Sequence, residues 1–110
     1  MKPGTAMEGA KPNIRRIVIT LDGDKKPQLA QGDEDVTISP ADNEQILWES
    51  AEDFLINFKE DSPFYERQFS NKYALSGLSR RNVIPSKSVF YEYTIIVNGQ
   101  SLDPRIRIDP

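Results

Sequence analysis

The residues best suited to chemistry in this chain are carboxylates. Five of them fall in two predicted turns and could offer oxygen ligands to a calcium ion: Asp22, Asp24, Asp33, Glu34 and Asp35. The spacing of a twelve-residue calcium-binding loop is missing, however, and acidic side chains are common in turns because they hydrogen-bond the local backbone. We therefore expect these residues to form turns and to hold no metal.

Acidic side chains also recur between positions 42 and 66, where two carboxylates could divide the roles of acid and base. The candidates are Asp42, Glu44, Glu49, Glu52, Asp53, Glu60, Asp61 and Glu66. Such a pair needs burial to separate its pKa values, and a solvated acidic face fits this pattern better. The chain has no histidine and no cysteine, which removes the commonest general base, the thiolate nucleophile and any disulfide. We predict a protein that is not an enzyme and binds no cofactor.

Basic side chains gather in the second half of the chain, at Lys72, Arg80, Arg81 and Lys87, and Arg15 with Arg16 could lie near them. Together with aromatic rings they could contact phosphates. The formal net charge is -3, from 14 basic and 17 acidic residues, and gives no electrostatic footprint for nucleic acid. We expect these cations to pair with the acidic face, and we expect no nucleic-acid partner.

A period of two in residues 88–110 predicts the most regular element. Two sets of side chains alternate there, Val89, Tyr91, Tyr93, Ile95 and Val97 against Phe90, Glu92, Thr94, Ile96 and Asn98. Turns are predicted at Asn98-Gly99 and Asp103-Pro104. A short closing strand follows, in which Ile106 and Ile108 point inward and Arg105 and Arg107 point outward.

Earlier segments show the same alternation. Residues 14–21 and 35–39 read as strands, with Ile17, Ile19 and Leu21 on one face of the first and Val36 with Ile38 on one face of the second. Residues 22–24 and 32–34 read as turns, and the Asp-Gly pair of the first tolerates positive φ. Pro27 marks an extended stretch between them.

Residues 40–59 fit two structures. In one, Ser39 caps a helix that begins at Pro40 and carries an apolar stripe. In the other, residues 45–50 and 53–59 are strands, with Ile46 and Trp48 on one face of the first. Periodicity and helix propensity alone leave the helix somewhat ahead.

Residues 61–84 form a long connection that is too apolar to lie in solvent, so we expect it to pack over one end of the domain. Ser62-Pro63 predicts a short helical turn through Phe69, and residues 82–84 a short strand. Most aromatic residues on the strands should form a core, namely Trp48, Phe54, Phe58, Tyr91 and Tyr93. Phe90 and Ile96 should then point outward. The candidate partner surface comprises Phe64, Tyr65, Phe69, Tyr73, Phe90 and Ile96.

The length of 110 residues indicates one domain, which we place at 14–110 behind a disordered tail at 1–13 rich in Gly and Pro. No apolar run approaches the ~20 residues of a membrane span, so no membrane partner is expected. The first residues lack the apolar region of a signal peptide. A cytoplasmic location follows if the chain is full length.

The order of these segments resembles the cupredoxin-like fold. The matching features are the tryptophan strand ILWES, the following DFLINF, a Ser-Pro-Phe connection, a long crossing, a Tyr-x-Tyr strand and a last strand after a tight loop. The resemblance covers residues 14–110 and implies an all-β, Greek-key β-sandwich with one long, partly helical connection. It also favours two strands over a helix in residues 40–59, because a lone helix fits poorly in a small antiparallel sandwich.

The copper ligands of that family are absent here. A blue-copper site needs two imidazoles and a thiolate. The first histidine position falls near Asp53 or Phe54, and the last-loop positions fall near Ile95, Asn98 and Leu102. The resemblance therefore implies small bacterial domains of this fold that lack the copper site. We predict a non-catalytic, metal-free interaction module that binds a protein partner or self-associates. The alternative is a small-ligand or glycan-binding domain that uses the loop end at residues 62–75.

Overall fold

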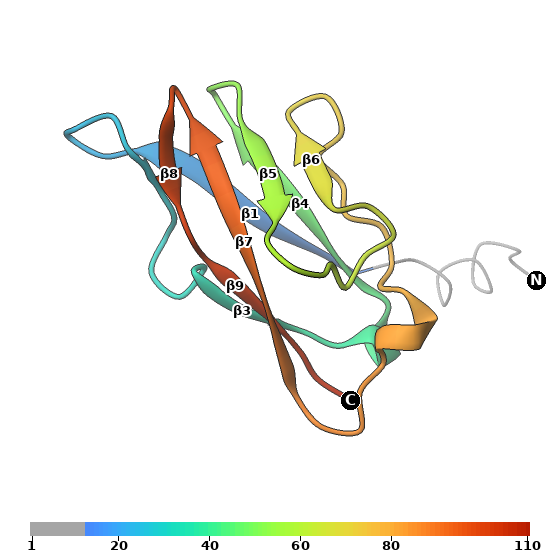
Figure 1. Ribbon diagram of the computed structural model, residues 1–110. Helices are drawn as coiled ribbons and strands as arrows, with labels where there is room; N and C mark the ends of the chain where they lie inside the picture. Colours follow the sequence, from blue (N-terminus) through green and yellow to red (C-terminus); the bar gives the residue numbers. More distant parts are fainter. Residues whose placement is uncertain (1–12) are drawn as a thin grey trace, which may run out of the picture.

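The computed structural model describes residues 13–110, which form two packed β-sheets (Figure 1). This confirms the predicted all-β sandwich. The elements in chain order are β1 (Asn13–Leu21), β2 (Pro27–Gln28), β3 (Asp35–Ile38), η1 (Pro40–Asp42), β4 (Glu44–Ser50), β5 (Leu55–Phe58), β6 (Gln68–Ser70), η2 (Arg81–Val83), β7 (Val89–Val97), β8 (Gln100–Leu102) and β9 (Arg105–Ile108), where η marks a short 3₁₀ helix.

The predicted tail at 1–13 lies outside the described residues except at its last position. Asn13 belongs to β1, where its backbone N–H donates to the carbonyl of Asn43 at 3.1 Å. The strand therefore begins one residue earlier than the sequence predicts, because a pairing partner is present there.

The first sheet has the order β2-β1-β4, and β1 pairs with β4 in parallel from Asn13 to Ile19. The long connection runs along the other side of β4. The N–H of Trp48 donates to the carbonyl of Ala74 at 3.1 Å, and the N–H of Ser76 donates to the carbonyl of Ile46 at 2.8 Å. Residues 74–76 therefore complete the hydrogen bonding of β4 without forming a full strand.

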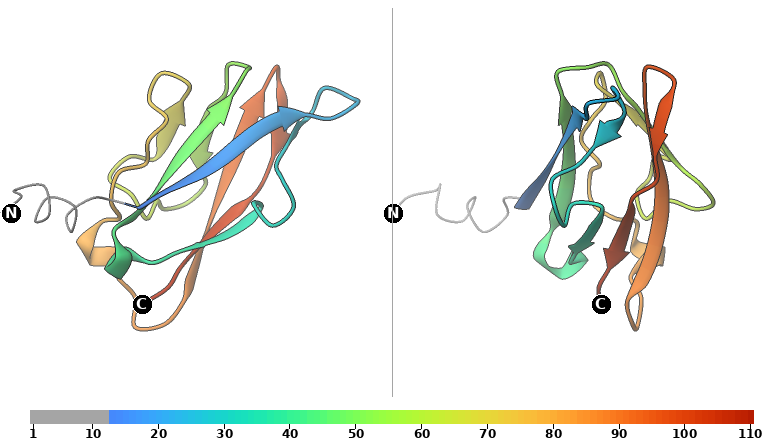
Figure 2. Two further views of the ribbon diagram at one scale, coloured as in Figure 1. Left: turned by 180° about the vertical axis from the view of Figure 1, so that it is seen from behind. Right: turned by 90° about the vertical axis from the view of Figure 1, so that its left-hand side faces the viewer.

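The second sheet has the order β3-β9-β7-β5-β6, with β8 paired to β7. Its pairs are antiparallel except β3 with β9, which run parallel. In the right-hand view of Figure 2, β1 and β4 lie in one layer and β7 lies in the other. Each sheet thus contains one parallel pair, between strands that are distant in sequence.

Residues 40–59 form two strands, as the resemblance implied. Ile46, Trp48, Ile56 and Phe58 are buried with the period of two that a strand requires. Helical structure is limited to η1, which ends at Asn43 with a positive φ of 57°. The side chain of Ser39 makes no capping hydrogen bond, so the helix signal at this position produces only one short turn.

The end of the chain matches its predicted pattern. Asn98 and Gly99 have φ values of 52° and 77°, so both central residues of the two-residue turn are left-handed, as a tight hairpin needs. Ile106 and Ile108 are buried in β9, while Arg105 is exposed and Arg107 is half-buried on the opposite face.

Two local predictions are wrong. No helical turn forms at residues 62–69, because Phe64 makes an isolated β-bridge with Ser79 and residues 68–70 become β6. Residues 82–84 are no strand, since η2 covers Arg81–Val83. The turn predicted at residues 22–24 is present, and its positive φ, 62°, belongs to Lys25. The side chain of Asp22 fixes that turn by accepting the N–H groups of Asp24 and Lys26 at 2.8 and 3.0 Å.

An aromatic cluster fills the space between the sheets. Its fully buried members are Trp48, Phe58, Phe64, Phe69 and Tyr93. The ring of Trp48 lies 5.0 Å from that of Phe69 and 5.7 Å from that of Tyr93. Ring pairs at these separations stabilise a core beyond the area that they bury. The long connection therefore belongs to the core through Phe64 and Phe69.

Candidate functional site

A groove of about 340 Å³ lies at the end of the sandwich where η1 and η2 meet (Figure 1). Its lining residues are Pro40, Asn43, Tyr65, Leu78, Ser79, Arg81 and Ile84. Three large apolar side chains on it are well exposed: Tyr65 at 71%, Ile84 at 57% and Leu78 at 47%. An apolar cluster of this kind marks an interaction surface more often than a scattered single side chain does.

The loop around Ser62 explains why neighbouring aromatic residues point in opposite directions. The Ser62 hydroxyl donates to the carbonyl of Glu66 at 2.7 Å and accepts the N–H of Phe64 at 3.0 Å. These bonds hold Phe64 in the extended bridge with Ser79, with its ring in the core. Tyr65 follows directly and projects to the outside, because successive side chains of an extended chain alternate.

Arg80 lies between the groove residues Ser79 and Arg81 and bonds this segment to the loop at Asp61 and Ser62. Its guanidinium lies 3.0 and 3.1 Å from the two carboxylate oxygens of Asp61 and donates to the carbonyl of Ser62 at 2.6 Å. Charge-assisted bonds of this kind are short and strong. The neighbouring Arg81 lines the groove and forms no ion pair with any residue in the described range 13–110.

The six residues of the predicted partner surface separate into distinct environments. Phe64 and Phe69 are core residues, which corrects their assignment to a surface. Tyr73 lies flat on Phe69, with ring centroids 5.9 Å apart and planes at 5°, and its outer side is exposed. Tyr65 is the one member that faces the groove.

Sequence reasoning missed most of the groove. Leu78 and Ile84 lie in the long connection predicted at residues 61–84, and Ile84 also lies in the strand predicted at 82–84, but neither was assigned to a site. A usable signal was present, since both lie in a segment punctuated by Gly77 and Pro85 and neither continues a buried alternation. Pro40 and Asn43 could not be assigned, because they reach the groove only through the pairing of β4 with β1.

Phe90 and Ile96 lie on the outer face of β7, as predicted. The guanidinium of Arg105 sits over the Phe90 ring at 4.1 Å from its centroid, a cation–π contact. Ile96 is half-buried between its cross-strand partners Leu55 and Ser101. Within residues 13–110 the outer face is shielded only by such side chains, and no second layer lies over it.

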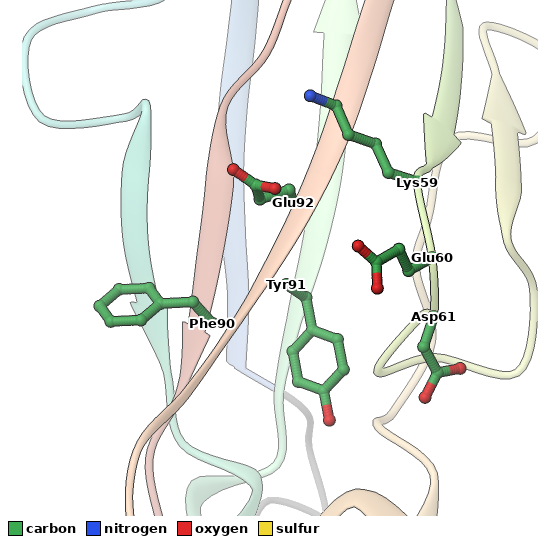
Figure 3. A pocket seen from close by; sticks show the side chains of 6 residues that line it. All are labelled: Lys59, Glu60, Asp61, Phe90, Tyr91 and Glu92. Atoms are coloured by element: carbon green, nitrogen blue, oxygen red, sulfur yellow. The ribbon is translucent and has the colours of Figure 1, made fainter.

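A smaller hollow of about 190 Å³ lies between β7 and the chain after β5 (Figure 3). Tyr91 points toward Asp61 there, while Phe90 points to the opposite side of β7. Burial raises the pKa of the Tyr91 phenol, and the Asp61 carboxylate raises that pKa further, against a smaller opposing effect of Arg80. Asp61 is already paired with Arg80, and Lys59 with Asp103 at 3.3 Å, so this charged hollow is the weaker candidate for a site.

The acidic turn residues act locally. Both bonds from the backbone N–H groups of Lys26 and Asp24 lower the pKa of Asp22, which is consistent with a turn former. Within residues 13–110 no three acidic side chains lie close enough together to hold a metal ion. Asp103 accepts a hydrogen bond from the Thr94 hydroxyl at 2.9 Å, which lowers its pKa together with Lys59.

Several of the basic residues are paired, as expected. Arg16 lies 2.9 Å from Glu49, Arg15 lies 3.9 Å from Asp33, and Arg80 holds Asp61. Lys72 and Lys87 form no ion pair with another residue of the described part. The basic residues are therefore spread over the molecule and make no continuous positive surface.

Trp48 and Tyr93 form a buried polar pair in the core. The indole N–H of Trp48 donates to the Tyr93 hydroxyl at 3.4 Å. Burial raises the pKa of the Tyr93 phenol well above its ordinary value. The Tyr93 phenol therefore stays protonated in the core between the two sheets. Trp48 and Tyr93 are both buried, which confirms their interpretation as core residues.

The positions that the resemblance assigns to copper ligands are occupied by structural residues. Phe54 and Ile95 are buried apolar side chains, and Leu102 packs against the core from β8. Asn98 forms the tight turn. Apolar side chains cannot ligate a metal, so this end of the sandwich is closed by packing.

No protein-family model, no curated protein and no solved structure matches the chain. No helix in residues 13–110 is long and apolar enough to cross a membrane.

Proposed function

We propose that this chain is a non-catalytic, metal-free interaction module that binds a protein partner through the groove around Tyr65. The observation that carries the proposal is the exposure of Tyr65, Ile84 and Leu78 around one concave surface. Binding of an apolar side chain in the groove would remove this surface from water. Tyr and Arg dominate the energetics of many protein interfaces, and both Tyr65 and Arg81 are available here.

The scaffold that we propose for this module is a cupredoxin-like Greek-key sandwich without copper. The parallel pairing of β1 with β4 and of β3 with β9 supports it, since each pair joins two strands of one sheet that are distant in sequence. The absence of histidine and cysteine from the sequence supports a scaffold that has no blue-copper site and no imidazole or thiolate catalyst.

The alternative, a small-ligand or glycan site at residues 62–75, has narrower support. It rests on the exposed rings of Tyr65 and Tyr73, which could stack on a sugar. Phe64 and Phe69 from the same segment are used in the core, so they leave no aromatic-lined pocket for a ligand. We therefore favour a protein partner.

The test is affinity capture from an extract of the source cells with the wild-type protein, Tyr65→Glu and Leu55→Glu. Leu55 is the matched control, because it is also an exposed apolar residue but lies on the outer face of β5. We expect a captured protein that Tyr65→Glu loses and Leu55→Glu retains. Direct binding of that purified protein, measured by calorimetry, should weaken at least tenfold in Tyr65→Glu.

Two results would contradict the proposal. One is a captured set that Tyr65→Glu leaves unchanged. The other is concentration-dependent self-association in sedimentation velocity that Tyr65→Glu abolishes, which would identify a second copy as the occupant of the groove. Saturable binding of an oligosaccharide that Tyr73→Ala removes would favour the alternative.

A further inference from the structure

The first sheet ends in a long strand edge, residues 14–18 of β1, with which no described strand pairs on its outer side. The N–H of Asn13 donates toward β4, to the carbonyl of Asn43, whereas the N–H of Asp22 donates toward β2, to the carbonyl of Lys26. Because backbone groups alternate in direction along a strand, odd-numbered residues of β1 bond to β4 and even-numbered residues face the other side. β2 meets that side only at Thr20 and Leu21.

Ile14, Arg16 and Val18 are therefore left with their N–H and C=O groups directed away from the sheet. Within residues 13–110 no strand pairs with them on that side. The other outer strands differ. β3 and β6 are four and three residues long, and β4 is bonded by residues 74–76. An open edge of this length is a template for another strand.

The side chains of the same three residues lie together on the outer face of the first sheet. Ile14 is 42% and Val18 is 47% exposed, and between them Arg16 reaches Glu49 at 2.9 Å. The edge thus presents an apolar, a cationic and a second apolar side chain in a row. A strand placed beside it would bury the two apolar side chains and meet the Arg16 guanidinium, which already pairs with Glu49 of β4 on its other side.

We propose that β1 binds an extended segment of a partner protein as an additional antiparallel strand, with an acidic residue opposite Arg16 and an apolar residue two positions to each side. Main-chain hydrogen bonds to Ile14, Arg16 and Val18 would supply affinity, and alternate side chains would supply specificity. β2 occupies the edge from Thr20 onward, so the pairing spans residues 14–18.

A second copy of this chain fits the edge less well. A two-fold axis that used the whole open edge would place Ile14 opposite Val18 and Arg16 directly opposite its own copy. Like charges in directly opposed positions destabilise a strand pair. Arg16 therefore acts against self-association while it favours an acidic partner.

This inference goes beyond the groove proposed above and uses none of its residues. Tyr65→Glu should leave strand addition unchanged, and a change in β1 should leave groove binding unchanged. Failure of one proposal is therefore distinguishable from failure of the other.

The experiment uses the full chain, labelled with nitrogen-15, and a capped peptide of sequence TVTETVT as the probe. In an antiparallel pairing its Val, Glu and Val side chains would lie beside Val18, Arg16 and Ile14. We expect saturable amide shifts, with exchange of the Ile14, Arg16 and Val18 amides slowed at least tenfold. The peptide TVTKTVT, in which Lys replaces Glu, should bind at least fivefold more weakly.

Arg16→Pro removes the N–H that the added strand needs but no hydrogen bond to β4, so it should abolish binding while the chain stays folded. Arg16→Ala is the matched control, because it removes the charge and keeps the N–H. It should retain binding and lose the preference for Glu over Lys. Val18→Pro is a second variant for the case in which Arg16→Pro does not fold, as judged by Trp48 fluorescence.

Three results would overturn the proposal. The first is no slowing of exchange at the three amides at millimolar peptide. The second is equal binding by Arg16→Pro and Arg16→Ala. The third is protection of these amides without peptide that disappears when residues 1–12 are deleted, which would identify the chain's own first residues as the occupant.

Discussion

The two edges of the first sheet differ in how their backbone hydrogen-bonding groups are paired. On the side of β4, the connection from β6 supplies the carbonyl of Ala74, the N–H of Ser76 and the hydroxyl of Ser76, which accepts the N–H of Ile46 at 2.8 Å. On the side of β1, only Thr20 and Leu21 have a partner strand among residues 13–110. The β4 edge is thus covered by a segment that is anchored in the core. The β1 edge is open over residues 14–18, where Arg15 and Arg16 are exposed.

The difference shows what it takes to close a strand edge. Residues 74–76 are held in place because Phe69 and Tyr73, just before them, stack on each other and Phe69 packs on Trp48. The turn between β1 and β2 has no apolar side chain of its own, and β2, in which Pro27 is buried, pairs with β1 at only two positions, so most of the edge stays open. A strand edge is thus covered where apolar packing holds a neighbouring segment beside it, and that segment then forms the backbone hydrogen bonds to the edge.

The largest expected effect is in amide exchange. The N–H groups of Ile46 and Trp48 are bonded to residues 74–76, whereas those of Arg16 and Val18 face outward. Domains of this size are stable by about 5–15 kcal/mol, so protected amides that open only by global unfolding should exchange about a thousandfold or more slowly than the open ones. Residue-resolved exchange by NMR measures this. Similar rates on both sides would remove the distinction between the edges.

Phe69→Ala should cost about 3–5 kcal/mol in the free energy of unfolding, because it removes a fully buried ring that touches Trp48 and supports the closed edge. Urea denaturation followed by Trp48 fluorescence gives the value. Tyr73→Ala is the control, since it loses only the exposed half of the stack, worth about 0.5–1.5 kcal/mol. Equal losses would show that the connection is held by something other than Phe69.

Ser76→Ala should cost about 1–3 kcal/mol, because the buried N–H of Ile46 would lose its acceptor. Exchange of the Ile46 amide should accelerate more than exchange of the β1 amides that bond to β4. Ser101→Ala, an exposed serine in β8, should change stability by less than about 0.5 kcal/mol. If the two variants behave alike, the hydroxyl of Ser76 does not close the edge.

The strands were the most predictable part of the fold. In β1, β3, β7 and β9 a period of two is visible because one face of each is buried, and Asn98-Gly99 carries its own turn geometry. Residues 40–59 were ambiguous because helix-forming residues such as Leu47 and Ala51 coincide with the alternation of Ile46 and Trp48. Packing against the second sheet decides for strands there.

The candidate site was predicted only in part. Tyr65 was named for its type, but nothing local separates it from Phe64, which is buried because a bridge to Ser79 turns it inward. The groove forms only where η1 and η2 lie side by side, and the edge of β1 is open only because β2 is two residues long. Both depend on contacts between segments far apart in sequence, which periodicity does not contain.

Asp22→Asn should have the smallest effect, and its sign depends on pH. The pKa of Asp22 is lowered in the folded protein by hydrogen bonds from the Lys26 and Asp24 backbone. A group with a depressed folded pKa adds stability above its unfolded pKa, about 3.9, and loses that contribution as the pH falls through the folded value. The variant should therefore be slightly less stable than the wild type at pH 7 and equal to it near pH 2.

Urea denaturation of both proteins at several pH values measures this difference. Asp22 lies in a surface turn and is only half-buried, so the gap should be small at every pH. Asp24→Asn, in the same turn, is the control, because the Asp24 carboxylate accepts no hydrogen bond from residues 13–110, and it should change stability less than Asp22→Asn does. Within residues 13–110 this turn leads into β2, the one strand that pairs with the outer side of β1, so loosening the turn should also accelerate amide exchange at Thr20. A stability difference between wild type and Asp22→Asn that grows toward low pH would show that Asp22 does not hold the turn by its charge.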